Sequence, residues 1–185
     1  MILTKSDWID IAKTLITSRL IDTIEENELT AKKKVLYQFS ARGHELGQII
    51  LAHHLNNPHD GATVYYRSRP FVLAAGMTIE EAFAGPISNT GSLNGGRDIG
   101  VVHHLPSRKG VTIMPASGDV GAQFTPAVGW AQAAVYRTNV LKEDDWKESI
   151  AVALGGDASC ATNGFWSALT IATTQNFPMI FFIED

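Results

Sequence analysis

The sequence has little cysteine, little net charge and no long apolar run, and each shortage excludes a class of protein. Cys160 is the only cysteine among 185 residues, so no disulfide can form within the chain, and a reducing compartment such as the cytoplasm is expected. The formal net charge of −4 gives no sign of a surface for nucleic acid or for an anionic membrane. The apolar runs are too short to span a bilayer, and no secretory signal is expected at the amino terminus.

Familiar motifs for nucleotides and zinc are also missing. No Gly-Lys-Ser/Thr follows Gly155-Gly156-Asp157, so this turn is not a Walker loop, and no Gly-x-Gly-x-x-Gly follows a predicted strand. The chain has neither a cysteine cluster nor a His-x-x-x-His spacing, which leaves a zinc site poorly supported. A nucleotide-binding domain and a zinc protein are therefore disfavoured.

The composition that remains is that of a globular protein, with 45% hydrophobic and 18% charged residues. After Ser6, an expected N-cap, apolar residues recur at helical spacing and predict a helix over residues 7–26. Two more helices are expected, over residues 44–55 and 124–136. Residues 85–121 are rich in glycine and predict a long loop that is either functional or disordered.

The last part of the chain predicts a strand, a turn, a helix and a second strand. The strands are expected over residues 149–154 and 178–183, and a shorter one over residues 64–66. This order is typical of an α/β fold with a parallel sheet flanked by helices, in which ligands bind beyond the carboxyl ends of the strands. No linker divides residues 1–185, so a single domain is expected, with the strand at 178–183 in the centre of its sheet.

The turn Gly155-Gly156-Asp157 is the first candidate for chemistry, because it follows a predicted strand directly. Two glycines let a backbone approach a ligand closely. An aspartate beside them can bind a hard cation such as Mg²⁺, which takes oxygen ligands and bridges to phosphates. It can equally cap the next helix, and this segment alone leaves both readings open.

Four other side chains could take part in chemistry. Tyr66 and Arg67 offer donors to a phosphate, although a strand end with solvated arginines is the alternative. His103 and His104 point to opposite sides of an extended segment, so they can hardly share a metal. One of them could be catalytic by bonding a substrate carboxylate or diphosphate, and the alternative is a pair of loop histidines. Cys160 is expected to pack rather than react.

Taken in order, these pieces resemble the alpha part of the thiamine-diphosphate-dependent E1 component of 2-oxo-acid dehydrogenase complexes. The resemblance covers roughly residues 5 to 185. Its central motif opens with Gly-Asp-Gly and closes about thirty residues later with Asn-Asn. The matching segments are Gly156-Asp157-Ala158, Tyr66-Arg67, Gly43-His44-Glu45, Gly95-Gly96-Arg97 with His103, and Gly118-Asp119-Val120-Gly121-Ala122-Gln123.

The resemblance implies a thiamine-diphosphate-binding fold that is incomplete at its carboxyl terminus, and it implies a role for particular residues. Asp157 would bind Mg²⁺, and the diphosphate would meet one group of residues while the cofactor's rings would meet another. The diphosphate group is Tyr66, Arg67, Gly156, Asp157, Ala158 and Ser159. Gly118 and Val120 would line the aminopyrimidine or thiazolium region.

The activity implied by the resemblance is oxidative decarboxylation of a 2-oxo acid, with transfer of the acyl group to lipoyl groups on a partner acyltransferase. An E1 beta chain or a fused second half would complete the site, and the complete protein would be oligomeric. Counting along the motif places the second metal ligand just after Asp185, so the chain alone is expected to be inactive.

Several positions depart from the family pattern. Ala158 replaces a glycine, Asp119 replaces an apolar residue, and Arg69 stands where many members have His or Glu. Phe39 falls where pyruvate-specific members have a histidine, so we expect a more apolar substrate pocket that favours branched or longer 2-oxo acids. The alternatives are a sister thiamine enzyme, such as an acetoin dehydrogenase or a transketolase-like protein, and a non-catalytic remnant.

Overall fold

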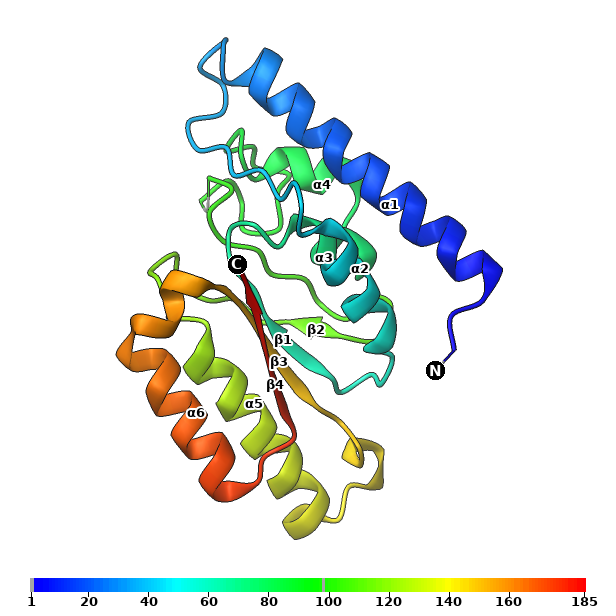
Figure 1. Cartoon of the computed structure of the whole chain (residues 1–185), viewed down its shortest axis with the longest axis vertical. Helices are drawn as coiled ribbons and strands as arrows, with labels where there is room; N and C mark the ends of the chain where they lie inside the picture. The colour runs from blue at the N-terminus through cyan, green and yellow to red at the C-terminus, as the bar shows by residue number, and fades with distance from the viewer. Residues whose placement is uncertain (1, 98) are drawn as a thin grey trace.

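The computed structural model describes residues 2–97 and 99–185, which fold around a parallel sheet of four strands (Figure 1). The strands are β1 (Gly61–Thr63), β2 (Thr112–Ile113), β3 (Ala151–Gly156) and β4 (Met179–Glu184). Their order in the sheet is β2-β1-β3-β4, and every neighbouring pair is parallel. The expected α/β fold with a parallel sheet flanked by helices is therefore confirmed.

Six α-helices surround or extend this sheet. They are α1 (Lys5–Ile24), α2 (Glu45–His54), α3 (Arg69–Ala74), α4 (Ile79–Ala84), α5 (Phe124–Tyr136) and α6 (Asn163–Gln175). Five-residue π-helical turns, Glu25–Leu29 and Arg137–Leu141, continue α1 and α5. Two 3₁₀ turns, Asp144–Trp146 and Asp157–Ala161, come before and after β3.

The sheet is covered on both faces, as a parallel sheet requires (Figure 1). Val152 and Leu154 of β3 belong to the core beneath α2 and α3, whereas Ala153 packs against α5 and α6. Consecutive side chains of a strand point to opposite faces, so β3 is fully buried from Ala151 to Gly155. The long apolar run of this strand follows from burial on both sides.

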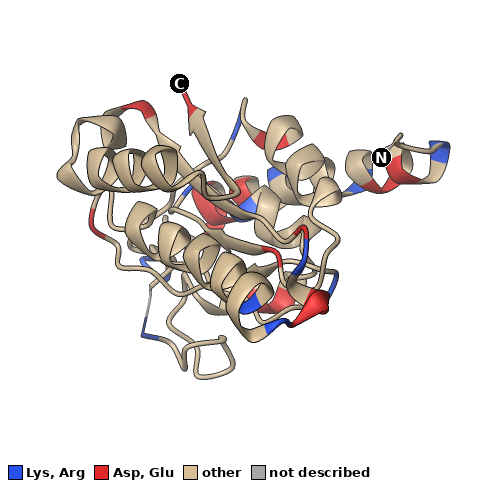
Figure 2. Cartoon of the chain, turned by 90° about the horizontal axis from the view of Figure 1, so that it is seen from below, with Lys and Arg blue, Asp and Glu red and all other residues tan. Residues whose placement is uncertain are grey.

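α5 and α6 carry no charged side chain, and Figure 2 draws both helices tan throughout. Their alanines pack against each other and against β3. The outer side of α6 leaves Trp166 and Ile171 exposed. The exposed side of α6 is consequently uncharged, with polar side chains such as Thr170 and Thr174 beside these two apolar ones.

Several predicted elements differ from those of the structure. Thr4, not Ser6, caps α1: its hydroxyl accepts a hydrogen bond from the Asp7 N–H while the Asp7 carboxylate accepts one from the Thr4 N–H. The strand expected over residues 64–66 ends at Thr63, because Ser68 N–H bonds the Tyr65 carbonyl and forms a turn. β2 lies inside the stretch that the sequence predicted as loop.

The terminal strand, expected to be central in a complete sheet and to leave an unpaired edge in this chain, is β4, which forms an edge here. Within residues 2–97 and 99–185 it pairs with β3 alone. Ile180 and Ile183 are partly exposed along it. In the same described part of the chain, no helix is long and apolar enough to cross a membrane.

Candidate functional site

The site lies where the order of the strands reverses. β1 is followed in sequence by β2 on one side of it and, after α5, by β3 on its other side. In open α/β sheets such a switch point opens a crevice at the carboxyl ends of the strands, because the connections leave in opposite directions. The loops after β1, β2 and β3 all emerge at this edge.

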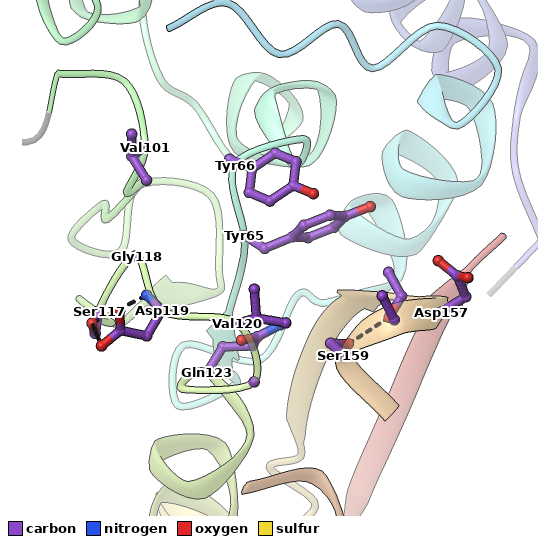
Figure 3. Close-up of a pocket in the computed structure, with 13 residues that line it drawn as sticks. Tyr65, Tyr66, Val101, Ser117, Gly118, Asp119, Val120, Gln123, Asp157 and Ser159 are labelled. Carbon is purple, nitrogen blue, oxygen red and sulfur yellow. Dashed lines mark hydrogen bonds between the residues drawn. The ribbon is translucent and has the colours of Figure 1, made fainter. Parts of the chain in front are cut away.

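A cavity of about 100 Å³ occupies the switch point (Figure 3). Three separate segments form its walls, together with the side chain of Val101. They are Tyr65 and Tyr66 after β1, residues 117–121 with Gln123 after β2, and residues 156–159 after β3. Gln123 joins its own wall to β3 and to β1. Its side-chain amide donates to Leu154 O at 3.1 Å, and its backbone carbonyl accepts from the Thr63 hydroxyl at 2.7 Å.

The structure brings the predicted cofactor residues together, with one exception. The cavity is lined by Tyr66, Gly118, Val120, Gly156, Asp157, Ala158 and Ser159. Arg67 does not line it: its Nη1 donates to Ser40 O at 2.7 Å, and its guanidinium lies 5.4 Å from the centre of the Tyr66 ring. The Ser40 bond uses one of the five N–H donors of the arginine.

Asp157 is exposed at the end of β3 and opens the 3₁₀ turn. It does not cap α6, because the Thr162 hydroxyl accepts from Phe165 N–H and performs that role. The helix-cap reading of this carboxylate is therefore wrong. Among the residues described, no group of three or more His, Cys, Asp and Glu side chains could hold a metal by itself.

The two carboxylates of the cavity face different partners. Asp119 is turned toward Ser117, on the side of the cavity opposite Asp157 (Figure 3). The Ser117 hydroxyl donates to the Asp119 carboxylate at 3.1 Å, and Asp119 N–H donates back to that hydroxyl at 3.2 Å. The unexpected charge of Asp119 thus closes a local turn, while Asp157 keeps its carboxylate open to the surface.

Phe39, the predicted substrate-pocket residue, lies behind the cavity wall. Its ring packs on Tyr66 with centroids 4.4 Å apart and an angle of 39°. Val120 stands on the opposite loop with its side chain 63% exposed, which is high for an apolar residue that lines a cavity. The site is therefore bordered by aromatic and aliphatic surface as well as by polar groups.

His103 and His104 do not reach this cavity. Both line a second, smaller cavity beside α4, together with Met77, Glu81 and Pro86. His103 is buried, and its Nε2 lies 3.4 Å from the carbonyl oxygen of Tyr66. Burial, reinforced by Arg69, lowers the pKa of His103 to about 4. A catalytic role for either histidine stays a prediction.

A buried carboxyl that sequence reasoning missed lies next to the cavity. Glu184 accepts hydrogen bonds from Gln48 at 2.9 and 3.0 Å and from the Tyr65 hydroxyl at 2.8 Å. Burial raises the pKa of Glu184. We refer to Gln48, Tyr65 and Glu184 as the Glu184 cluster. The available signal was a glutamate that ends an apolar strand and a glutamine on the buried side of α2.

A second buried cluster is formed around Arg69, four residues after Tyr65. Arg69 donates to Asp22 at 2.7 Å and to Glu25 at 2.8 Å, and all three side chains are almost fully buried. Asp22 also accepts from Ser40 Oγ and Ala41 N. We refer to Asp22, Glu25 and Arg69 as the Arg69 cluster. It fastens α1 to α3, which gives Arg69 a structural task in this chain.

Cys160 lies at intermediate depth in the 3₁₀ turn after Asp157. Burial raises the pKa of its thiol, and the nearby Asp157 charge raises it further. A raised pKa leaves little thiolate at neutral pH, which agrees with the expectation that this cysteine packs rather than reacts.

Fold and site together define an α/β protein with a cavity at the switch point of a parallel sheet, bordered by glycines, aromatic rings and the exposed carboxylate of Asp157. The particular family follows from a comparison with known families. The model of the dehydrogenase E1 component matches residues 12–185, and the chain belongs to this family. Its members are generally thiamine-diphosphate-dependent 2-oxo-acid dehydrogenase components, and they usually work with a beta subunit and an acyltransferase.

Proposed function

We propose that the chain holds the diphosphate end of thiamine diphosphate, with its Mg²⁺, in the oxidative decarboxylation of a 2-oxo acid. The observation that carries the proposal is the cavity itself. Tyr66, the loop of Gly118 and Val120, and the turn at Asp157 come from three distant parts of the sequence and line one space at the switch point. That edge of the sheet is where α/β proteins bind phosphorylated ligands.

The donor set fits a magnesium ion bound through phosphate. Mg²⁺ is usually held by one or two carboxylates and completes its shell with substrate phosphates and water. The exposed carboxylate of Asp157 supplies one such ligand, and the described residues contain no group able to enclose the metal without the phosphates. The remaining ligands would come from phosphate oxygens and water.

Each wall of the cavity then has a task. The backbone N–H groups of Ala158 and Ser159 and the hydroxyl of Tyr66 would donate to diphosphate oxygens. Arg67 would turn away from Ser40 and add the N–H donors of its guanidinium. Gly156 has no atom within 3.8 Å of a Cβ placed on it, so its backbone is open to the cavity.

Thiamine diphosphate, when bound, supplies the electron sink that decarboxylation of a 2-oxo acid needs. Gly118 and Val120 would border its ring region, where the exposed side chain of Val120 offers a shape to pack against. The acyl group would pass to lipoyl groups on a partner acyltransferase. One of His103 and His104 could contact the substrate only after a movement of their segment.

A second chain or a fused second half is part of the proposal. Sites for drug-sized ligands measure roughly 300–1,000 Å³, so a cavity of about 100 Å³ can enclose only part of this cofactor. Trp166 and Ile171, exposed on the outer side of α6, offer apolar contacts for assembly into an oligomer. We therefore propose that the chain alone is inactive. The single cysteine favours the cytoplasm as its location.

For the substrate we propose a branched or longer 2-oxo acid. Phe39 backs Tyr66 and makes this side of the site aromatic, without the histidine of pyruvate-specific members. Turnover of pyruvate and of a branched-chain 2-oxo acid by the holoenzyme, compared as kcat/KM, tests this point. Equal or better turnover of pyruvate would refute the proposed preference.

The direct test is calorimetric titration of the holoenzyme, first stripped of bound cofactor and metal, with thiamine diphosphate and Mg²⁺. Asp157→Asn should weaken binding by about a hundredfold, because it removes a charged metal ligand. The matched control is Asp119→Asn, the other carboxylate of the cavity, which should change affinity by less than about threefold since it only closes a turn.

The other outcomes separate the alternatives. No binding by the unaltered holoenzyme would refute the proposed function and favour a non-catalytic remnant. Binding without 2-oxo-acid-dependent reduction of lipoyl groups would favour a sister thiamine enzyme.

A further inference from the structure

The segment from Tyr65 to Arg67 leaves the sheet after β1, yet its carbonyls are all hydrogen-bonded. Tyr65 O accepts from Ser68 N–H at 2.9 Å, and Tyr66 O lies 3.4 Å from the Nε2 of His103. Arg67 O accepts from Gln48 Nε2 at 3.2 Å. Loops usually satisfy such groups with water. Here a local backbone N–H bonds the first carbonyl, and side chains from distant elements, His103 and Gln48, bond the other two.

Gln48 is the hub of this arrangement. It is fully buried on α2, and its amide nitrogen donates to Arg67 O and to both oxygens of Glu184. Its amide oxygen accepts from the backbone N–H of Phe71 at 3.3 Å, in the first turn of α3. One side chain thus joins the segment before α3, the start of α3 and the end of β4.

Glu184 connects this hub to the cavity wall. It accepts the hydroxyl proton of Tyr65, whose ring lines the cavity, and its Cα is the ladder partner of Gly156. His44 Nδ1 lies 3.7 Å from its other oxygen. Glu184 therefore touches the two sides of the cavity that the proposed function assigns to diphosphate.

We propose that Gln48 and Glu184 are positioning residues, which hold the Tyr65–Arg67 segment in the geometry that receives the diphosphate. The inference rests on the proposed function and adds which residues fix the conformation of the Tyr65–Arg67 segment. Neither side chain lines the cavity, so both act through Tyr65 and through the Arg67 backbone. Fixing these groups before binding removes an ordering cost that the ligand would otherwise meet.

Glu184→Gln is the sharpest variant, because it keeps the volume and changes one oxygen to an NH₂ group. That group must face either the Gln48 amide or the Tyr65 hydroxyl, so at least one hydrogen bond is lost. The holoenzyme should then bind thiamine diphosphate with Mg²⁺ about tenfold more weakly, and inorganic diphosphate with Mg²⁺ in the same proportion. The readout is calorimetry rather than activity.

Asp60→Asn is the matched control. Asp60 is also a buried carboxyl, and it accepts from the backbone N–H groups of Asn57 and Ile150 at the amino end of the sheet. Burial raises its pKa as it does that of Glu184. Both variants should lower the melting temperature, but only Glu184→Gln should weaken binding of the diphosphate compounds.

Affinity losses that are equal in the two variants, or absent from both, would overturn the positioning role. If Glu184→Gln does not fold, Tyr65→Phe removes only the hydroxyl that donates to Glu184. Unchanged affinity in that variant would overturn the role as well. Failure of the unaltered holoenzyme to bind thiamine diphosphate would instead refute the proposed function, so the two failures are distinguishable.

Discussion

The Glu184 cluster holds Tyr65 and the Arg69 cluster holds Arg69, so the two clusters fix the two ends of residues 65–69. They do so with different chemistry. In the Arg69 cluster, one guanidinium pairs with two buried carboxyl groups. In the Glu184 cluster, the hydrogen bonds to the carboxyl come from an amide and a phenol. The comparison separates an ion-paired anchor between helices from a polar contact that borders the ligand cavity.

The difference has an energetic consequence. Removing the guanidinium of Arg69 leaves two carboxyl groups buried without a positive partner, which is strongly destabilising. Removing one neutral donor from Glu184 leaves the other donor in place. We therefore expect the Arg69 cluster to govern stability and the Glu184 cluster to govern ligand binding.

The largest effect is expected for Arg69→Met, which should lower the free energy of unfolding by about 3–5 kcal/mol. Asp22 and Glu25 would remain buried, and burial already raises the pKa of Glu25. Urea denaturation measures the loss. Arg108→Met is the control, since Arg108 bonds Glu81 at the surface and its loss should cost about 1 kcal/mol or less. Similar losses in both variants would remove the distinction between a buried anchor and a surface pair.

An intermediate effect is expected from pH, through His103, which touches the segment between the two clusters. Its pKa falls from 6.5 to about 4 on folding, because burial, Arg69 and His104 disfavour the imidazolium. The unfolded chain binds the proton first as pH falls. The contribution of His103 to the free energy of unfolding is therefore complete above pH 6.5, and it decreases by about 3 kcal/mol between pH 6.5 and 4.

His103→Gln keeps a donor for the Tyr66 carbonyl but does not titrate. Its free energy of unfolding, followed by urea denaturation from pH 7 to 4.5, should fall less steeply than that of the unaltered protein. Carboxyl groups such as Glu25 and Glu184 titrate in both proteins, so the difference between the two curves isolates the histidine. Parallel curves would contradict the buried neutral state of His103.

The smallest effect is expected for Tyr65→Phe, which should lower the free energy of unfolding by about 1 kcal/mol. The ring stays in the cavity wall, and Gln48 still donates to Glu184. Tyr37→Phe is the control, because Tyr37 is half exposed, and its change should stay within about 0.5 kcal/mol. A loss near that of Arg69→Met would show that the Glu184 cluster is itself a main anchor of the fold.

The sequence was sufficient to predict those parts of the site whose residues are close together along the chain. Gly156, Asp157 and Ser159 follow one strand directly, and the rule for parallel sheets brings the loops of neighbouring strands to the same edge. The loop of Gly118 and Val120 was placed by its motif, and its arrival in the same cavity agrees with that rule. Tyr66 was assigned by its motif, although the strand expected to contain it ends at Thr63, and α5 and α6 were predicted from the local sequence.

The two clusters could not be predicted, because their members lie far apart in sequence. Arg69 meets Asp22 across 47 positions, and no local pattern distinguishes this arginine from a solvated one. The end of β1 was missed for a similar reason, since a turn closed by Ser68 overrides the β propensity of Val64 and Tyr65. Tertiary contacts decide these features.

The hydrogen bond between Gln48 and Glu184 joins residues 136 positions apart. Such a contact forms only after a long loop has closed, and long-range pairing of parallel strands is slow. The cavity should therefore be completed late in folding, when β4 docks on β3. A ligand that needs the finished cavity cannot assist the earlier steps. It would slow unfolding while leaving the folding rate almost unchanged.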